Sequence, residues 1–87
     1  MKNTTPISTQ NSLFKLLLEA TEIDNIQCRY IAFKLAENSV KTIIRIERID
    51  KLKYTVKTDN GSYLVEAYRL TFQLNIKQYR VVKIFNP

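Results

Sequence analysis

The chain has 87 residues, which is enough for one small domain and no more. Hydrophobic residues make up 45% of it, and it contains only one Gly and two Pro, which excludes a disordered or low-complexity chain. Because it has no His and a single cysteine, Cys28, it offers no imidazole base, no His/Cys zinc cluster and no intrachain disulfide. The composition therefore favours a binding module over an enzyme, with no catalytic residue, no metal and no cofactor expected.

Positive charge is concentrated in the later part of the chain. Residues 1–25 hold two cations and three acids, a net charge of −1, whereas residues 26–87 hold twelve cations and five acids, a net charge of +7. From Arg69 onward there are four cations and no acid. A basic region of this kind attracts polyanions such as nucleic acid, although a solvated surface without such a partner is the alternative.

No segment of the sequence has the pattern of a membrane span or a signal peptide. The longest uncharged stretch is twelve residues, well below the length that crosses a bilayer, and the N-terminus is polar. We therefore expect a cytoplasmic protein with no membrane partner.

The first third of the chain predicts an arm, a helix and a strand. Residues 1–10 are polar and predict a flexible N-terminal arm ahead of a single domain over residues 11–87. Residues 11–23 predict a helix with one apolar stripe. Residues 26–35 predict a strand, with a second helix as the alternative, because Ile26, Tyr30 and Phe33 also suit helical spacing.

The rest of the chain is rich in β-branched and aromatic residues and predicts further strands separated by turns. Asp59-Asn60-Gly61 is the strongest turn signal, because Asn and Gly tolerate a positive φ. The short connections make the strands mostly antiparallel. The expected strands cover residues 40–49, 53–58, 62–74 and 79–85.

This pattern predicts an α+β protein in which one helix is followed by about five antiparallel strands. Five short strands can close into a small Sm- or SH3-like barrel, with the helix covering one open end. The alternative is an open, curved sheet wrapped around the helix, as in cystatin-like and nuclear-transport-factor-like folds. Pairing between the first and last strands would distinguish the barrel from the open sheet.

Residues Gly61 to Tyr68 (GSYLVEAY) and, about a dozen positions later, Tyr79 to Ile84 (YRVVKI) resemble the core of the WYL domain family. That family shows a glycine turn, a Trp-Tyr-Leu strand opening, and a last strand of aromatic-Arg-hydrophobic-x-basic-Ile type. Here Ser62 replaces the Trp, and Val82 stands where an acid is common. The resemblance implies an Sm-like barrel that works as a regulatory ligand- or nucleic-acid-binding module.

The first candidate site consists of cations and tyrosines near the end of the chain. The resemblance matches Arg80 and Lys83 to the basic positions of the closing strand, and Arg69 on the preceding strand can join them around a phosphate. Arg80 and Lys83 have opposite strand parity, so without a bulge only one of them shares a face with a ligand. Tyr63 and Tyr79 adjoin turns and are candidates for base stacking, with core packing as the alternative.

A second basic strip lies in the middle of the chain and includes Arg45 and Lys53. A hairpin with such charges can follow a phosphate backbone, or it can protect a sheet edge. The sequence therefore predicts a small regulatory or accessory subunit that binds single-stranded nucleic acid or another anionic ligand. The alternatives are a cystatin-like module that docks on a protein partner without nucleic acid, and a homo-oligomer with its site between subunits.

Overall fold

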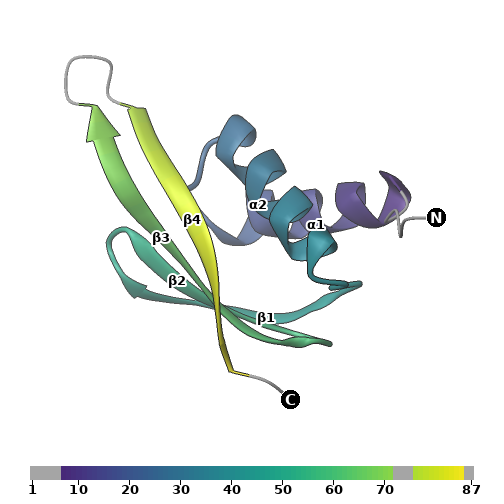
Figure 1. Ribbon diagram of the computed structural model, residues 1–87. Helices are drawn as coiled ribbons and strands as arrows, with labels where there is room; N and C mark the ends of the chain where they lie inside the picture. The colour runs from purple at the N-terminus through teal and green to yellow at the C-terminus, as the bar shows by residue number, and fades with distance from the viewer. Residues whose placement is uncertain (1–6, 72–75, 86–87) are drawn as a thin grey trace.

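A computed structural model describes residues 7–71 and 76–85 as two helices followed by an antiparallel sheet. The helices are α1 (Ile7–Ala20) and α2 (Asn25–Glu37). Both helices lie on one side of a twisted sheet (Figure 1). The strands are β1 (Ile43–Asp50), β2 (Lys53–Thr58), β3 (Gly61–Thr71) and β4 (Ile76–Phe85).

The segment expected to be the first strand is instead the helix α2. Asp24 begins this helix as its N-cap, where its side chain accepts a 2.8 Å hydrogen bond from the Gln27 N–H. Buried residues then follow at helical spacing: Cys28, Ile31, Ala32, Leu35 and Ala36. The alternative reading of residues 26–35 is therefore the correct one, because the cap and this buried stripe favour a helix over a strand.

The sheet is open in the described residues, so the expected barrel is wrong. The strand order is β1-β2-β3-β4, which leaves β1 and β4 as the two edges instead of neighbours. With residues 26–35 in a helix, four strands are described in place of the expected five. The coarser prediction, an α+β domain with an antiparallel sheet, is confirmed, and the open sheet matches the alternative arrangement.

Other boundaries differ from expectation by a few residues. Helix α1 begins at Ile7, within the expected arm, and residues 1–6 lie outside the described residues. β2 has the expected bounds, and Gly61, the first residue of β3, has a φ of 101°. The end of the predicted strand 62–74 also falls partly outside the described residues.

The core lies between the two helices and the sheet. Every second side chain of β2, β3 and β4 points toward the helices, which is the pattern of a sheet with one covered face. Hydrophobic burial of this kind is the main stabilising contribution in a small domain. The core residues from the sheet are Tyr54, Val56, Tyr63, Val65 and Tyr79, and those from α1 are Leu13 and Leu17.

Each of the four register shifts in the sheet leaves one residue without a cross-strand partner. These residues are Ile44 and Ile49 in β1, Tyr68 in β3 and Ile84 in β4. All four are large, and all are at least half exposed, from 50% for Ile84 to 61% for Ile44. Bulges increase the local twist of the strands, which agrees with the curved shape of this sheet in Figure 1.

Candidate anion-binding face

The sheet has a second face, turned away from both helices, which we call the open face. Its residues alternate with the core residues in the strand register. Most of them are polar, and four of them are cations. The open face consists of Arg45, Glu47, Asp50, Lys53, Thr55, Lys57, Ser62, Leu64, Glu66, Arg80 and Val82.

Three of the predicted site residues meet on this face. Arg45 lies on β1, Lys53 on β2 and Arg80 on β4, so three strands each supply one cation. The register places Lys53 and Arg80 on either side of Glu66 on β3, whereas Arg45 pairs with Lys57, four residues farther along β2. The sequence placed these cations far apart, and the antiparallel pairing brings them onto one surface.

Acidic neighbours neutralise part of this charge. Arg45 forms an ion pair with Glu47 at 2.6 Å between Nη2 and Oε2. Glu66 is paired with Arg80 at 2.8 Å and with Lys53 at 3.9 Å. With four cations and three carboxylates, the open face has a net charge of +1.

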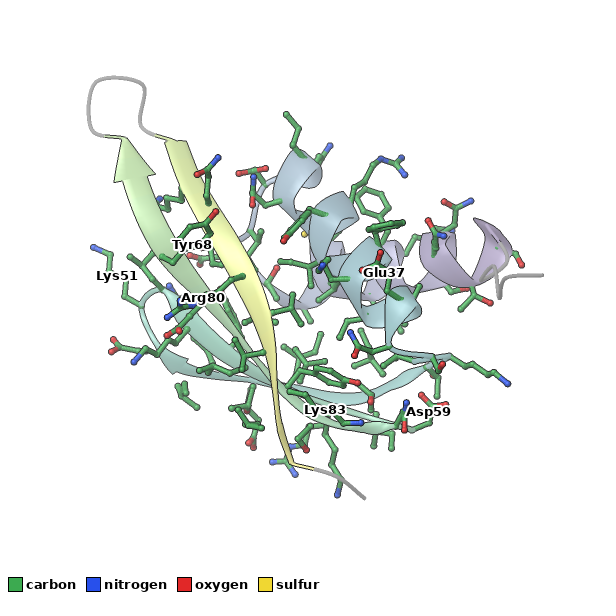
Figure 2. The ribbon with its side chains drawn as sticks, viewed as in Figure 1. Glu37, Lys51, Asp59, Tyr68, Arg80 and Lys83 are labelled. Carbon is green, nitrogen blue, oxygen red and sulfur yellow. The ribbon has the colours of Figure 1, made fainter. Side chains whose placement is uncertain are left out.

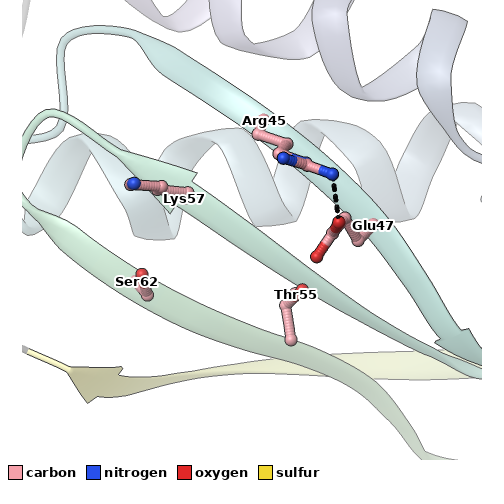
Figure 3. A pocket seen from close by; sticks show the side chains of 5 residues that line it. All are labelled: Arg45, Glu47, Thr55, Lys57 and Ser62. Carbon is pink, nitrogen blue, oxygen red and sulfur yellow. Dashed lines mark ion pairs between the residues drawn. The ribbon is translucent and has the colours of Figure 1, made fainter.

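Lys57 is the cation of this face without an ion pair among the described residues. It lies beside a hollow of about 290 Å³ that is lined by Arg45, Glu47, Thr55, Lys57 and Ser62. Figure 3 shows these side chains on the near side of the strands, with the helices behind the sheet. Ammonium, guanidinium and hydroxyl groups are donors suited to a phosphate or carboxylate.

The turn between β2 and β3 holds one end of the hollow in place. Asp59 accepts hydrogen bonds from the N–H groups of Lys41 at 3.0 Å and Thr42 at 3.1 Å, which ties this turn to the segment before β1. Burial of the Asp59 carboxyl opposes its ionisation, but these hydrogen bonds outweigh that effect and lower its pKa. Ser62 follows this turn on β3 and pairs with Lys57 on β2.

The two tyrosines predicted to stack on bases are core residues. Tyr63 is 1% exposed and Tyr79 is 5% exposed, so neither ring is offered to a ligand. Burial raises the pKa of both hydroxyls, and Tyr63 donates a 3.2 Å hydrogen bond to the carbonyl of Asn60. The alternative reading, core packing, is correct for both, because each has the strand parity that faces the helices.

Tyr68 is an exposed aromatic residue that the sequence reasoning did not select. Its ring is 55% exposed, and the Arg80 guanidinium carbon lies 5.9 Å from the ring centroid. Figure 2 shows Tyr68 and Arg80 beside each other on β3 and β4. Tyr68 has the parity of Glu66, a charged residue on the open face, and the bulge at Tyr68 brings it beside Arg80.

Of the other two predicted cations, Lys83 does not join this group. Lys83 pairs with Tyr63, and its Nζ lies 5.8 Å from the centroid of that ring, on the helix side of the sheet. Figure 2 places Lys83 farther along β4, toward Asp59 and away from Arg80. The backbone of Arg69 pairs with Gln78, while its side chain lies outside the described part of the structure. The opposite parity of Arg80 and Lys83 is thus confirmed.

Metal-binding clusters and membrane-spanning helices are both absent from residues 7–71 and 76–85. No group of three or more His, Cys, Asp or Glu side chains is arranged to hold a metal ion there. In the same part of the chain, neither helix has the length and hydropathy needed to cross a bilayer. Cys28 is buried, and burial raises its thiol pKa.

Comparison with known proteins gives no relative for this chain. It matches no protein-family model, no curated protein and no solved structure.

Proposed function

We propose that the protein binds a phosphate-bearing anion, with single-stranded nucleic acid as the ligand class, on the open face of its sheet. The observation that carries this proposal is the polar hollow beside Lys57, which lies among Arg45, Thr55 and Ser62. Lys57 has no ion pair within the described residues, so its charge is available to a ligand. A role as a cytoplasmic regulatory or accessory subunit, which the resemblance to the WYL family also implies, belongs to the same proposal.

The rest of the open face extends this site toward β4. Tyr68 offers an exposed ring beside Arg80, and stacking of a base on an aromatic ring contributes about 1–3 kcal/mol. Arg80 is already bonded to Glu66, so it contributes less charge than a free arginine would. Binding in this proposal is therefore weak, dependent on salt, and centred on Lys57.

Fluorescence anisotropy with a short labelled oligonucleotide, measured at two salt concentrations, tests the proposal. Lys57→Ala is expected to weaken binding and to reduce the slope of log affinity against log salt by about 0.7, as for one phosphate contact on a single strand. Lys15→Ala on α1 is the matched control, because it removes the same charge from an exposed helix position. Competition with inorganic phosphate distinguishes a small-anion site from a nucleic-acid site. Absence of binding at low salt would overturn the proposal.

A second candidate function is docking on a protein partner through α2. Ile26, Tyr30 and Phe33 form an exposed stripe on this helix, with exposed fractions of 77%, 43% and 46%. An apolar stripe of this spacing is typical of helices that pack on another protein. Such docking predicts a complex that survives high salt, whereas the anion proposal predicts loss of binding under the same conditions.

A further inference from the structure

The outer edge of β4 presents backbone groups without partners. The N–H of Tyr79 donates a 3.0 Å hydrogen bond to Oε1 of Gln27 on α2, so it points away from β3. Backbone groups alternate in direction along an antiparallel strand, and the register from Tyr79 to Lys83 is regular. The N–H and C=O groups of Val81 and Lys83 therefore also point to the edge. In the described part of the chain, no hydrogen bond to these edge groups is found.

The two edges of the sheet differ in how they are protected. β1 contains two bulges and alternating charges, including Arg45, Glu47 and Arg48, which discourage pairing with another strand. On β4, Gln27 of α2 accepts the edge hydrogen bond of Tyr79, and the segment beyond it is Arg80-Val81-Val82-Lys83-Ile84. Val82 is 43% exposed and Ile84 is 50% exposed, so this half of the edge is both apolar and accessible.

We propose that β4 pairs antiparallel with β4 of a second copy of the chain, about a two-fold axis at Val82. In this register, Val81 lies opposite Lys83 of the partner subunit, and the two residues exchange both backbone hydrogen bonds. The symmetry repeats this pair on the other side of the axis, so all the free edge groups of Val81 and Lys83 are satisfied. Val82 faces the partner's Val82 at the centre, where two exposed apolar side chains cover each other.

The two neighbouring registers are less favourable because of the residues that they would place opposite each other. Centring the axis on Lys83 would place two lysines directly opposite each other, which is destabilising. Centring it on Val81 would place Lys83 opposite the partner's Tyr79, whose N–H is already bonded to Gln27. The edge is thus complementary to itself in the register centred on Val82, and this argues for a second copy over an unrelated strand.

This pairing joins two sheets into one and continues the open face across the axis. Arg80 has the same parity as Val82, so each copy supplies one Arg80 to the shared surface, on opposite sides of the axis. The dimer does not require the proposed anion. If the protein does not dimerise, the ligand proposal is unaffected. Because the paired segment is short, we expect a dimer that dissociates on dilution.

Sedimentation velocity over a range of protein concentrations tests the dimer, and cysteine pairing tests its register. Val82→Cys is expected to form a disulfide with its symmetry mate, because residues opposite each other in a non-hydrogen-bonded pair have Cα atoms about 4.5 Å apart. Ile84→Cys is the control, since the two Ile84 positions are offset by about 13 Å along the strands and lie too far apart for a disulfide. Wild-type protein, with only the buried Cys28, controls for other oxidation.

Lys83→Pro tests the edge hydrogen bonds without breaking the pairing of β4 with β3. The Lys83 N–H points to the edge, so proline removes one donor per copy and is expected to raise the dimer dissociation constant at least about tenfold. A monomer at every concentration up to roughly 1 mM would overturn the proposal. Equal crosslinking of Val82→Cys and Ile84→Cys would overturn the register, and if Lys83→Pro fails to fold, the cysteine pair alone decides.

Discussion

Arg80 on β4 donates two hydrogen bonds to a single carboxylate oxygen of Glu66 on β3, at 3.0 Å from Nε and 2.8 Å from Nη2. The other oxygen of Glu66 lies 3.9 Å from Nζ of Lys53 on β2. The Glu66 side chain is only 15% exposed, whereas those of Arg80 and Lys53 are about half exposed. One acid therefore links three strands and reduces the charge that two of the predicted ligand-binding cations can offer.

Glu66→Gln should separate these two roles. Removing the carboxylate weakens the links to β2 and β4, and because the cations are exposed we expect the free energy of unfolding to fall by only about 1 kcal/mol. The same change releases Arg80 and Lys53, so affinity for a short oligonucleotide at low salt should rise. Urea denaturation and fluorescence anisotropy measure the two effects. Lower affinity in a variant that remains folded would contradict the proposed role of the open face.

Substitution of two tyrosines on β3 should give opposite patterns. Tyr63→Ala removes a fully buried ring and should lower the free energy of unfolding by about 3–5 kcal/mol, enough to unfold much of a small domain. Tyr68→Ala should change stability by no more than about 1 kcal/mol, because its ring is largely exposed. In the folded Tyr68→Ala protein, oligonucleotide affinity should fall by about 1–3 kcal/mol. Unchanged affinity would remove Tyr68 from the site.

Asp59→Asn should destabilise the protein in a way that depends on pH. The pKa of Asp59 is lowered in the folded state, so its carboxylate contributes stability above its ordinary pKa near 4. This contribution is lost as the pH falls from about 4 through the folded-state pKa. We expect the variant to be less stable than wild type by about 1 kcal/mol at pH 7, with the difference shrinking below pH 4, as thermal unfolding at several pH values would show. If the stability difference between wild type and Asp59→Asn grew as the pH fell, it would contradict a stabilising role of the Asp59 carboxylate.

Gln27→Ala should loosen the contact between α2 and β4. The Gln27 side chain accepts a hydrogen bond from the Tyr79 N–H, although the two residues are 52 positions apart in the chain. Its loss leaves a partly buried donor without a protein partner, and we expect a decrease of about 1–2 kcal/mol in the free energy of unfolding. Hydrogen exchange should show faster exchange at the Tyr79 amide in particular. Equal protection in both proteins would show that the contact contributes nothing.

The sequence predicted the later strands better than the early part of the chain, and the reason is local. β2 alternates cleanly, and the turn through Gly61 has a strong chemical preference, so both were predicted correctly. The segment from Ile26 carries apolar residues on two sides of a helix, because Ile31 and Leu35 face the core while Ile26 and Tyr30 are exposed. When a helix is apolar on more than one side, its sequence no longer shows a clear helical period and can be mistaken for a strand. For this segment, the N-cap at Asp24 indicates the helix more clearly than the spacing of its hydrophobic residues.

Strand parity explains why three of the selected cations share a face, but the sequence did not single out Lys57, Tyr68 or the acids of that face. Arg45, Lys53 and Arg80 do share a face, because strand parity alone determines that placement once the register is set. The pairing of Glu66 with two of them depends on which strands are neighbours, which the sequence did not show. Tyr68 is placed beside Arg80 at a bulge, and a bulge depends on sheet curvature instead of local composition.

NMR chemical-shift mapping of the folded protein with a short single-stranded oligonucleotide tests the central claim most directly. Binding on the open face predicts that the largest shifts fall on the amides of Thr55, Lys57 and Ser62, and that they disappear at high salt. Shifts confined to the α2 stripe of Ile26, Tyr30 and Phe33, or the absence of any shift at low salt, would contradict it.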